Sequence, residues 1–421
     1  MASSSSADDR KAKLLEHIKS LIEQQRRPID DIIRENALQY LPAKSLLRFK
    51  SVSKQWRRWI SSPFFIHAQS NSFRSLSGLF INNNNGSSSF ASLDPSSYGV
   101  PDASLGFLPD DVRVCASSNG LLLCRGKIRP EIPNPLYYVC NPATRDWSFL
   151  PSPDCDHGGD ADSVLSFQPS ILGFDADFEV VVAFRIGDFD GIYGFEVFSS
   201  RTGRWRPSSA VCDGGRLVPF SGVVSGRVSL WRTSLPSVVA CYDAAADECW
   251  LAEMPPGFEG STWQIGEVMG RVCCVCIIGW TVTVYAMDGR GGGEVMRFFD
   301  VRDYGLEGMP RGLPFNGGDE VLIWIDGWIF ACGAVSEGTV RSVSRMESYN
   351  ADCVPYVNSL VPVKGPITCG ERQVRRRSWA VDHGSIASNG RVRFTSTVGC
   401  DGPAIERPTS PPHPPHRYID L

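Results

Sequence analysis

The sequence predicts an α+β multidomain protein, in which a small three-helix module precedes an all-β, propeller-like domain. Apolar residues recur at helical spacing between Ile29 and Phe65. From about residue 76 the pattern changes to short apolar runs separated by Gly, Asp and Asn turns. The 40 glycines, 29 prolines and 11 tryptophans of the chain suit a turn-rich β domain.

The stretch from Ile29 to Phe65 is expected to form three short helices. Asp30 and Asp31 are good N-terminal caps for a first helix, which Pro42 ends. Pro42 also opens a second helix, and a third ends before Pro63. The apolar positions of the three helices are Ile32, Ile33, Ala37, Leu38 and Leu41, then Leu46, Leu47 and Phe49, then Val52, Trp56, Trp59 and Ile60. Helices this short bury too little surface to be stable alone, so we expect them to need a partner or a neighbouring domain.

A repeated arrangement in the rest of the chain predicts propeller blades. In each copy an apolar strand is followed by a polar turn and then by an aromatic residue, and a glycine-led apolar strand comes before. The copies lie at 137–151, 193–207 and 238–255, with weaker ones at 282–301 and 344–362. Trp205 follows Trp147 by 58 residues and Trp250 follows Trp205 by 45. A multi-strand unit of roughly 40–50 residues is expected for a blade, and we interpret the tryptophans as core between blades rather than as ligand-binding aromatics.

The remaining segments complete the predicted domain organisation. Residues 1–12 are polar and are expected to be disordered. Residues 13–27 carry a short apolar stripe and are expected to form a helix beside the module, with a dimerisation helix as the alternative. We place the module at 28–70, the propeller-like domain at 76–400 and a proline-rich tail at 401–421.

Composition limits the function classes. The net charge of -4 gives no general attraction to nucleic acid or to an anionic membrane. The N-terminus lacks the apolar core of a secretory signal, and no apolar run is long enough to span a bilayer. We therefore expect a soluble protein of the nucleus or cytoplasm, in which the 14 cysteines are small core residues rather than disulfides. The basic run Arg372–Arg377 is interpreted as solvated surface, with nuclear import or phosphate contact as the alternative.

No catalytic motif is present. The six histidines are scattered, and no phosphate-binding loop, nucleophile elbow, zinc-protease motif or paired-carboxylate motif occurs. Cys274 and Cys276 share one face of a predicted strand but lack further metal ligands. An acidic loop contains Asp154, Asp156, His157, Asp160 and Asp162. We interpret it as a solvated connection rather than a cation site, and we predict no enzyme, no cofactor and no metal.

Two parts of the chain resemble a known family. Residues 41–65 are similar to the F-box of the large plant F-box family. The matching features are Leu41-Pro42, Lys44-Ser45-Leu46-Leu47-Arg48-Phe49, Val52-Ser53-Lys54, Trp56-Arg57, Ile60 and Ser62-Pro63. The family's opening Leu-Pro falls on Ile29-Asp30, and Ala37 stands where a large aliphatic residue is usual. Segments 117–124, 139–151 and 172–182 resemble the F-box associated domain, a kelch-like propeller that follows the F-box in many plant proteins.

The resemblance implies a substrate-recognition adaptor of an SCF-type (Skp–cullin–F-box) ubiquitin ligase. The module would dock on a Skp-type adaptor and through it on cullin, while the propeller loops would bind an unidentified protein substrate. The residues expected to face the adaptor are Ile33, Leu41, Pro42, Leu46, Leu47, Val52 and Trp56, some of which must form the module's own core. Two alternatives stay open. One is a non-ligase propeller scaffold or regulator with a degenerate F-box, and the other is a propeller enzyme or glycan-binding module.

Overall fold

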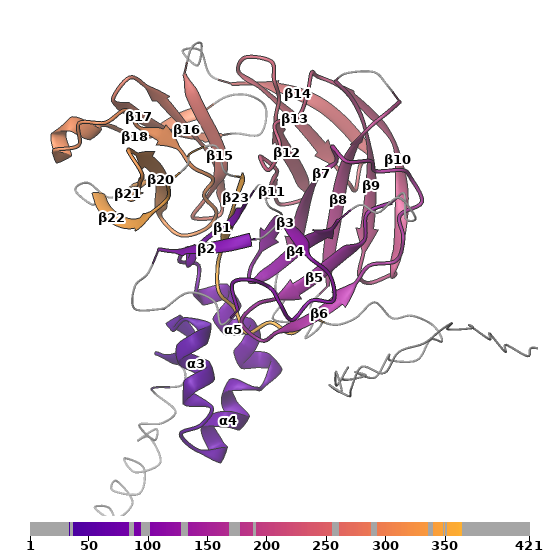
Figure 1. The fold of residues 1–421 in the computed structure, drawn as a ribbon, viewed down its shortest axis with the longest axis vertical. Helices are drawn as coiled ribbons and strands as arrows, with labels where there is room; N and C mark the ends of the chain where they lie inside the picture. The colour runs from indigo at the N-terminus through magenta and orange to yellow at the C-terminus, as the bar shows by residue number, and fades with distance from the viewer. Residues whose placement is uncertain are drawn as a thin grey trace, which may run out of the picture. The chain divides into compact units, whose positions relative to one another are not determined.

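The computed structural model describes residues 33, 37–83, 88–93, 102–127, 134–167, 177–187, 191–254, 261–287, 293–335, 340–347, 349 and 352–363. These residues belong to one compact unit and form helices followed by six β-sheets (Figure 1). The predicted fold class, a helical module before an all-β propeller, is confirmed. The predicted helix at 13–27, the segments 1–12 and 401–421, and the basic run at 372–377 lie outside the described residues.

The helical module contains one element that the sequence analysis missed. Its elements are the 3-10 helix η1 (Leu38–Tyr40) and the α-helices α3 (Ala43–Phe49), α4 (Lys54–Ile60) and α5 (Pro63–Ser72). Pro42 is the N-cap of α3, one place before the expected position. Pro63 follows the end of α4 as expected, but it also begins α5, which Ser62 caps by accepting the Phe65 amide at 3.3 Å. The apolar residues of α5 stand side by side at 64–66 rather than at helical spacing, so the pattern did not show the helix.

Five sheets have four antiparallel strands each. The first blade consists of β3 (Val112–Ser118), β4 (Leu121–Gly126), β5 (Tyr137–Asn141) and β6 (Asp146–Phe149). The second consists of β7 (Asp162–Phe167), β8 (Phe178–Arg185), β9 (Ile192–Ser199) and β10 (Arg204–Asp213). The third consists of β11 (Val223–Ser225), β12 (Val228–Arg232), β13 (Val238–Asp243) and β14 (Glu248–Glu253).

The fourth blade consists of β15 (Thr262–Val268), β16 (Arg271–Ile278), β17 (Thr281–Met287) and β18 (Gly293–Asp300), and the 3-10 helix η2 (Val301–Tyr304) follows it. The fifth consists of β19 (Arg311–Gly312), β20 (Glu320–Ile325), β21 (Trp328–Gly333) and β22 (Val340–Arg345). The strands β1 (Gly78–Asn82), β2 (Ser88–Ser92) and β23 (Asp352–Tyr356) form the sixth sheet.

The sixth blade joins the two ends of the propeller. Its order is β2-β1-β23, so the last strand pairs with the first, and Phe80 lies opposite Val354 in the antiparallel ladder. The strands β3, β7, β11, β15 and β19 are the first of their blades and lie beside one another around the axis, and β23 lies beside β3. The innermost strand of the closing blade therefore comes from the C-terminal side. The weak copy at 344–362 contains the end of β22 and all of β23, so it does not repeat the arrangement of the other copies.

Two of the three tryptophans that mark the repeat pack between blades. Trp205 is buried in a cluster that joins the first and second blades, and its Nε1–H donates to the Pro151 carbonyl at 2.7 Å. Trp250 is half-buried against a cluster that joins the third and fourth blades. Trp147 is 40% exposed, so its assignment to the core is wrong. On the outer strand β6 the buried position is Ser148, one residue later, and neighbouring strand residues face opposite sides of a sheet.

The described cysteines are core residues, as expected. All are free, and all except Cys155 and Cys249 are buried. Burial raises the pKa of the Cys115 thiol to about 11, which keeps it protonated and unreactive. Within the described part of the chain no group of three or more His, Cys, Asp or Glu side chains could hold a metal ion. Among the same residues no helix is long and apolar enough to cross a membrane.

Candidate functional site: the helical module and the arginine pocket

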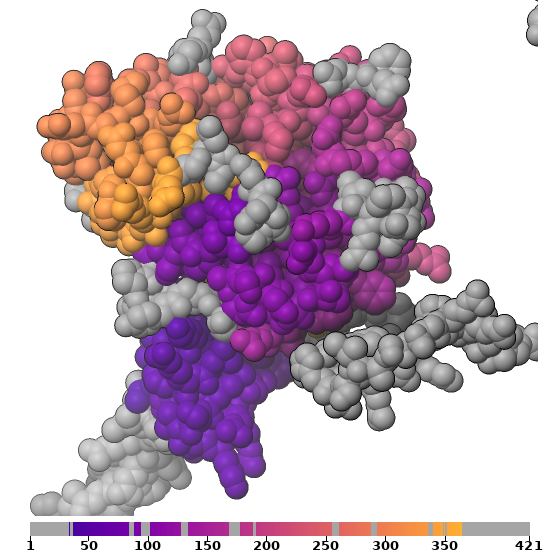
Figure 2. Space-filling view, viewed as in Figure 1, coloured from indigo at the N-terminus to yellow at the C-terminus, as the bar shows by residue number. Residues whose placement is uncertain are grey.

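The helical module shares its core with the propeller. Leu38, Ala43, Leu46, Ile60 and Phe65 are buried together with Ala143 of the β5–β6 turn and Leu360 after β23. The propeller is thus the neighbouring domain that such short helices need. Figure 2 shows the indigo helices lying against the propeller surface.

An extended segment after β23, residues 357–361, fastens the helices to the propeller, and we call it the strap. All five of its residues are buried. The side chain of Gln69 on α5 is buried between the strap and the start of α3. Its Nε2 donates to the Leu41 carbonyl at 3.2 Å, and its Oε1 accepts the Leu360 amide at 3.3 Å.

Asn141 ties the same strap to the first blade. Its Nδ2 donates to the carbonyls of Ser359 at 3.0 Å and Val361 at 2.7 Å, while its Oδ1 accepts the Ala143 amide at 2.9 Å. The strap also packs closely against Gly120. This glycine has φ +91, and a Cβ at its position would collide with Ser359 of the strap. Neither Gln69 nor Asn141 was predicted from the sequence, since an amide within a helix or at a strand end carries no sign of which distant carbonyl it will meet.

The structure divides the residues expected to face an adaptor. Leu46 is fully buried in the module core. Five of the others are half-buried: Ile33, Leu41, Pro42, Leu47 and Trp56. Only Val52 among the predicted residues is largely exposed, at 63%. Tyr40 and Phe64, which the sequence analysis did not select, are 57% and 64% exposed on the same module. The part of the seven predicted residues in adaptor binding stays a prediction.

A second candidate site is a pocket of about 490 Å³ at the end of the propeller where the inner strands begin. We call it the arginine pocket, because four arginines from four separate parts of the chain line it: Arg113, Arg125, Arg185 and Arg216. Asp160, Asp162 and Asp352 also line it. None of these arginines was predicted from the sequence as a site residue.

Charged groups of the pocket have partners within the protein. Arg113 forms an ion pair with Asp352, and its guanidinium lies 4.5 Å from the centroid of the Phe220 ring. Arg125 donates to the Ala161 carbonyl at 3.2 Å. Arg185 forms an ion pair with Asp160 at 3.2 Å, and the Asp160 side chain is largely exposed.

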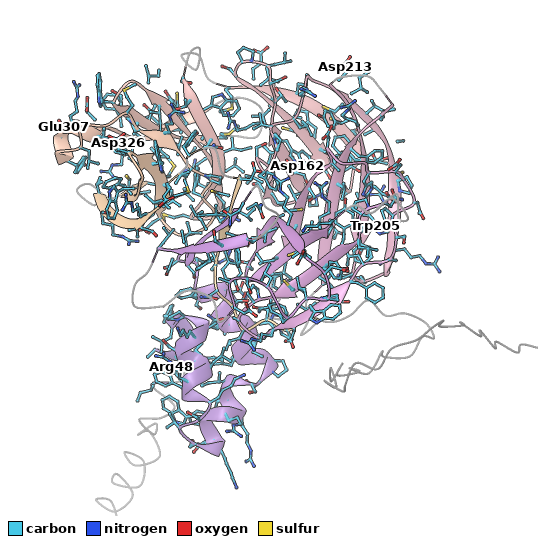
Figure 3. All side chains as sticks on the ribbon, viewed as in Figure 1. Arg48, Asp162, Trp205, Asp213, Glu307 and Asp326 are labelled. Carbon is cyan, nitrogen blue, oxygen red and sulfur yellow. The ribbon has the colours of Figure 1, made fainter. Side chains whose placement is uncertain are left out.

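Asp162 is the buried carboxyl group of the pocket (Figure 3). One carboxyl oxygen accepts the Ser163 amide at 2.8 Å. Burial raises the pKa of Asp162 to about 7, although the Ser163 amide and the Arg125 charge act in the opposite direction. The group is therefore partly protonated near neutral pH, unlike an ordinary aspartate.

The loop that leads to Asp160 and Asp162 contains a buried histidine, His157. His157 Nε2 lies 2.7 Å from Glu196 Oε2, and its Nδ1 lies 3.0 Å from the Tyr137 hydroxyl. Glu196 also accepts the amides of Asp154 at 2.9 Å and Cys155 at 3.2 Å. Burial alone would raise the pKa of Glu196, but these hydrogen bonds outweigh it and lower the pKa. The interpretation of the acidic loop as a solvated connection is therefore wrong for His157 and Asp162, which are buried, and right for Asp154, Asp156 and Asp160, which are exposed.

The two sites lie at opposite ends of the inner strand β23. Asp352, its first residue, lines the arginine pocket, and the strap under the helices follows its last residue, Tyr356. Five residues of strand span roughly 14 Å. In Figure 3 the labels of Asp162 and Arg48 mark the pocket and the helical module.

Comparison with family models agrees with both parts of this architecture. Residues 29–67 match the F-box domain, and residues 97–259 match a family described as "F-box protein At3g26010-like, beta-propeller". The chain thus combines an F-box domain with a β-propeller of a kind found in F-box proteins. The kelch-like character of this propeller stays a prediction.

The curated relatives are F-box proteins of Arabidopsis thaliana. F-box protein At5g49610 is 35% identical over 201 residues, which cover 44% of this chain and 51% of the relative. F-box protein At5g07610 is 32% identical over 194 residues, covering 42% and 44%. The chain spans about half the length of the curated relatives it matches.

The similarity of this chain to solved propeller structures is low. A fungal lectin from Aleuria aurantia, described as a six-bladed β-propeller, has a TM-score of 0.38 and 12% identity over 66% of this chain and 95% of the lectin. YCF48 bound to D1 peptide has a TM-score of 0.35 and 13% identity over 58% of this chain and 69% of that one. Scores of this size carry no functional argument.

Proposed function

We propose that this protein is the non-catalytic, substrate-recognition subunit of an SCF-type ubiquitin ligase. Its F-box docks on a Skp-type adaptor and through it on cullin, and its propeller binds a protein substrate. The observation that carries the proposal is the placement of the helical module and the arginine pocket at opposite ends of the same inner strand. A substrate held at the pocket leaves the helices accessible to the adaptor. We propose the nucleus or cytoplasm as its compartment.

The shared core supports this role. An adaptor accelerates transfer by fixing the position of the substrate relative to the charged enzyme, and proximity has its effect only when the connection is stiff. Here Leu360 and Ala143 of the propeller are packed into the core of the module, and Gln69 bonds both the helices and the strap. A flexible tether between the two parts would lose this benefit.

Exposed apolar side chains on the module support a docking surface. Val52, Tyr40 and Phe64 are all more than half exposed. We propose that they belong to one docking surface, because patches of exposed apolar residues are typical of protein interfaces. Leu41 belongs to the edge of the core, so substituting it would also disturb folding. Val52 is therefore the more informative position for a binding test.

The experiment is co-purification of the full chain with a Skp-type adaptor, comparing Val52→Asp with Val211→Asp. Val211 lies on β10 of the propeller and is 55% exposed, so it is a matched control. We expect Val52→Asp to weaken adaptor binding at least tenfold and Val211→Asp to leave it unchanged, with equal thermal stability. If a well-folded wild-type chain binds no adaptor, the proposal is refuted and a non-ligase propeller scaffold becomes the better description.

A further inference from the structure

We propose that the arginine pocket binds an oxyanion-bearing side chain of the substrate, either phosphorylated or carboxylic, flanked by apolar residues. This inference rests on the proposed function, because it gives the chemistry of the protein segment that the propeller presents.

The first observation is local charge. The chain carries a net charge of -4, yet four arginines meet around one pocket. Of the three aspartates that line it, Asp162 is buried and partly protonated near neutral pH, because burial disfavours its charged form. The positive charge of the pocket therefore exceeds its negative charge. Guanidinium groups match carboxylate and phosphate oxygens in pairs, so an oxyanion is the ligand that this lining favours.

The second observation is that the existing ion pairs are exchangeable. The pairs Arg113–Asp352 and Arg185–Asp160 both have solvent-exposed members, and the Asp160 side chain is 71% exposed. Exposed ion pairs contribute little net stability. An incoming oxyanion can therefore replace a rim carboxylate as the partner of Arg185 without disrupting the fold.

The third observation is the wall of the pocket. Phe220 has φ +57, a left-handed conformation that is costly for a bulky residue, and Arg113 lies over its ring. Strained residues held by their surroundings are concentrated at binding sites. Phe220 thus fixes the guanidinium of Arg113 and offers an apolar surface beside it, with Pro219 and Leu217 close by on the same loop.

The shape of the site favours a peptide over a small molecule. A second pocket, of about 220 Å³, shares residues 218–220 and Asp352 with the arginine pocket. Its lining is mixed, with Arg232 and Gln264 beside Leu313, Pro314 and Tyr349. Two pockets on either side of one short segment suit an extended chain that places one side chain in each, the charged one in the arginine pocket.

The test uses the purified full chain and three immobilised peptide libraries. Each library has randomised flanking positions without Lys or Arg, and the fixed central residue is phosphoserine, glutamate or glutamine. We expect at least one anionic library to retain the protein fivefold or more above the glutamine library. Comparing the phosphoserine with the glutamate library distinguishes the two sources of the oxyanion.

The variant Arg185→Gln/Arg216→Gln should remove this preference. The matched control is Arg201→Gln/Arg227→Gln, which removes two exposed, ion-paired arginines elsewhere on the propeller. Equal retention by all three libraries would overturn the inference, and so would an anionic preference that survives the pocket variant while thermal melting stays normal. The peptide libraries require no adaptor. If the anionic libraries show no preference but the chain still binds the adaptor, only the oxyanion inference is refuted. If the chain binds no adaptor but prefers an anionic library, the proposed function is refuted and the oxyanion site is supported.

Discussion

Asn141 is expected to be one of the most important single residues for holding the F-box to the propeller. It makes three hydrogen bonds of 3.0 Å or less in a fully buried setting, two to strap carbonyls and one to the Ala143 amide. A typical hydrogen bond contributes about 1 kcal/mol net, and a buried group left unsatisfied costs about 1–3 kcal/mol. We therefore expect Asn141→Ala to lower the free energy of unfolding by about 3–5 kcal/mol.

The assay is urea unfolding of the full chain followed by tryptophan fluorescence, together with limited proteolysis between the helices and the propeller. Asn141→Asp is an informative second variant. It keeps the size of the side chain but cannot donate, and it places a carboxylate opposite two carbonyl oxygens, so it should be at least as destabilising. Gln55→Ala, at an exposed amide side chain on α4, is the control and should change stability by less than about 0.5 kcal/mol. A loss below about 1 kcal/mol for Asn141→Ala, with unchanged proteolysis, would refute the strap's role in coupling the two parts.

Two further predictions concern the buried carboxyl groups of Glu196 and Asp162. The pKa of Glu196 is lowered in the folded protein, so its contribution to stability is present above the ordinary glutamate pKa of about 4.3 and is lost as the pH falls through the folded value. Glu196→Gln should therefore lower the melting temperature at pH 7, and the gap from wild type should narrow as the pH falls below the ordinary glutamate pKa; a constant gap would contradict this. The pKa of Asp162 is raised to about 7, so the cost of ionising it builds up as the pH rises from about 4 to 7. Asp162→Asn should consequently stabilise the chain in urea unfolding at pH 8 by up to about 4 kcal/mol and much less at pH 4, and an equal effect at both pH values would refute the assignment.

The blades were predictable because their signals are local. A hairpin such as β9–β10 needs two apolar strands and a turn, all within about twenty residues, and Gly203 at φ +66 supplies the turn. The same holds for α3 and α4, whose boundaries follow from Pro42, Ser53 and their apolar spacing. These elements are determined by residues that lie close together in the sequence.

The division of the F-box surface was not predictable from the pattern. Leu46 and Val52 belong to the same set of apolar residues in the sequence, yet one is fully buried and the other 63% exposed. What separates them is the position of α5 and of Leu360, which fill the space beside Leu46. Burial depends on what packs against a side chain, and that neighbour lies about 300 residues away in the chain.

The sequence by itself determined that this protein has a helical F-box module and a propeller built from repeated hairpins, because periodicity and turn residues act over short distances. Only the tertiary structure decided the closing blade, the strap and the arginine pocket. The pocket's arginines come from β3, β4, β8 and the loop before β11, and the intervals between them follow no repeat. Their charges meet because antiparallel blades bring the start of β3 and the ends of β4 and β8 to one face, a consequence of closure around an axis that no local pattern encodes.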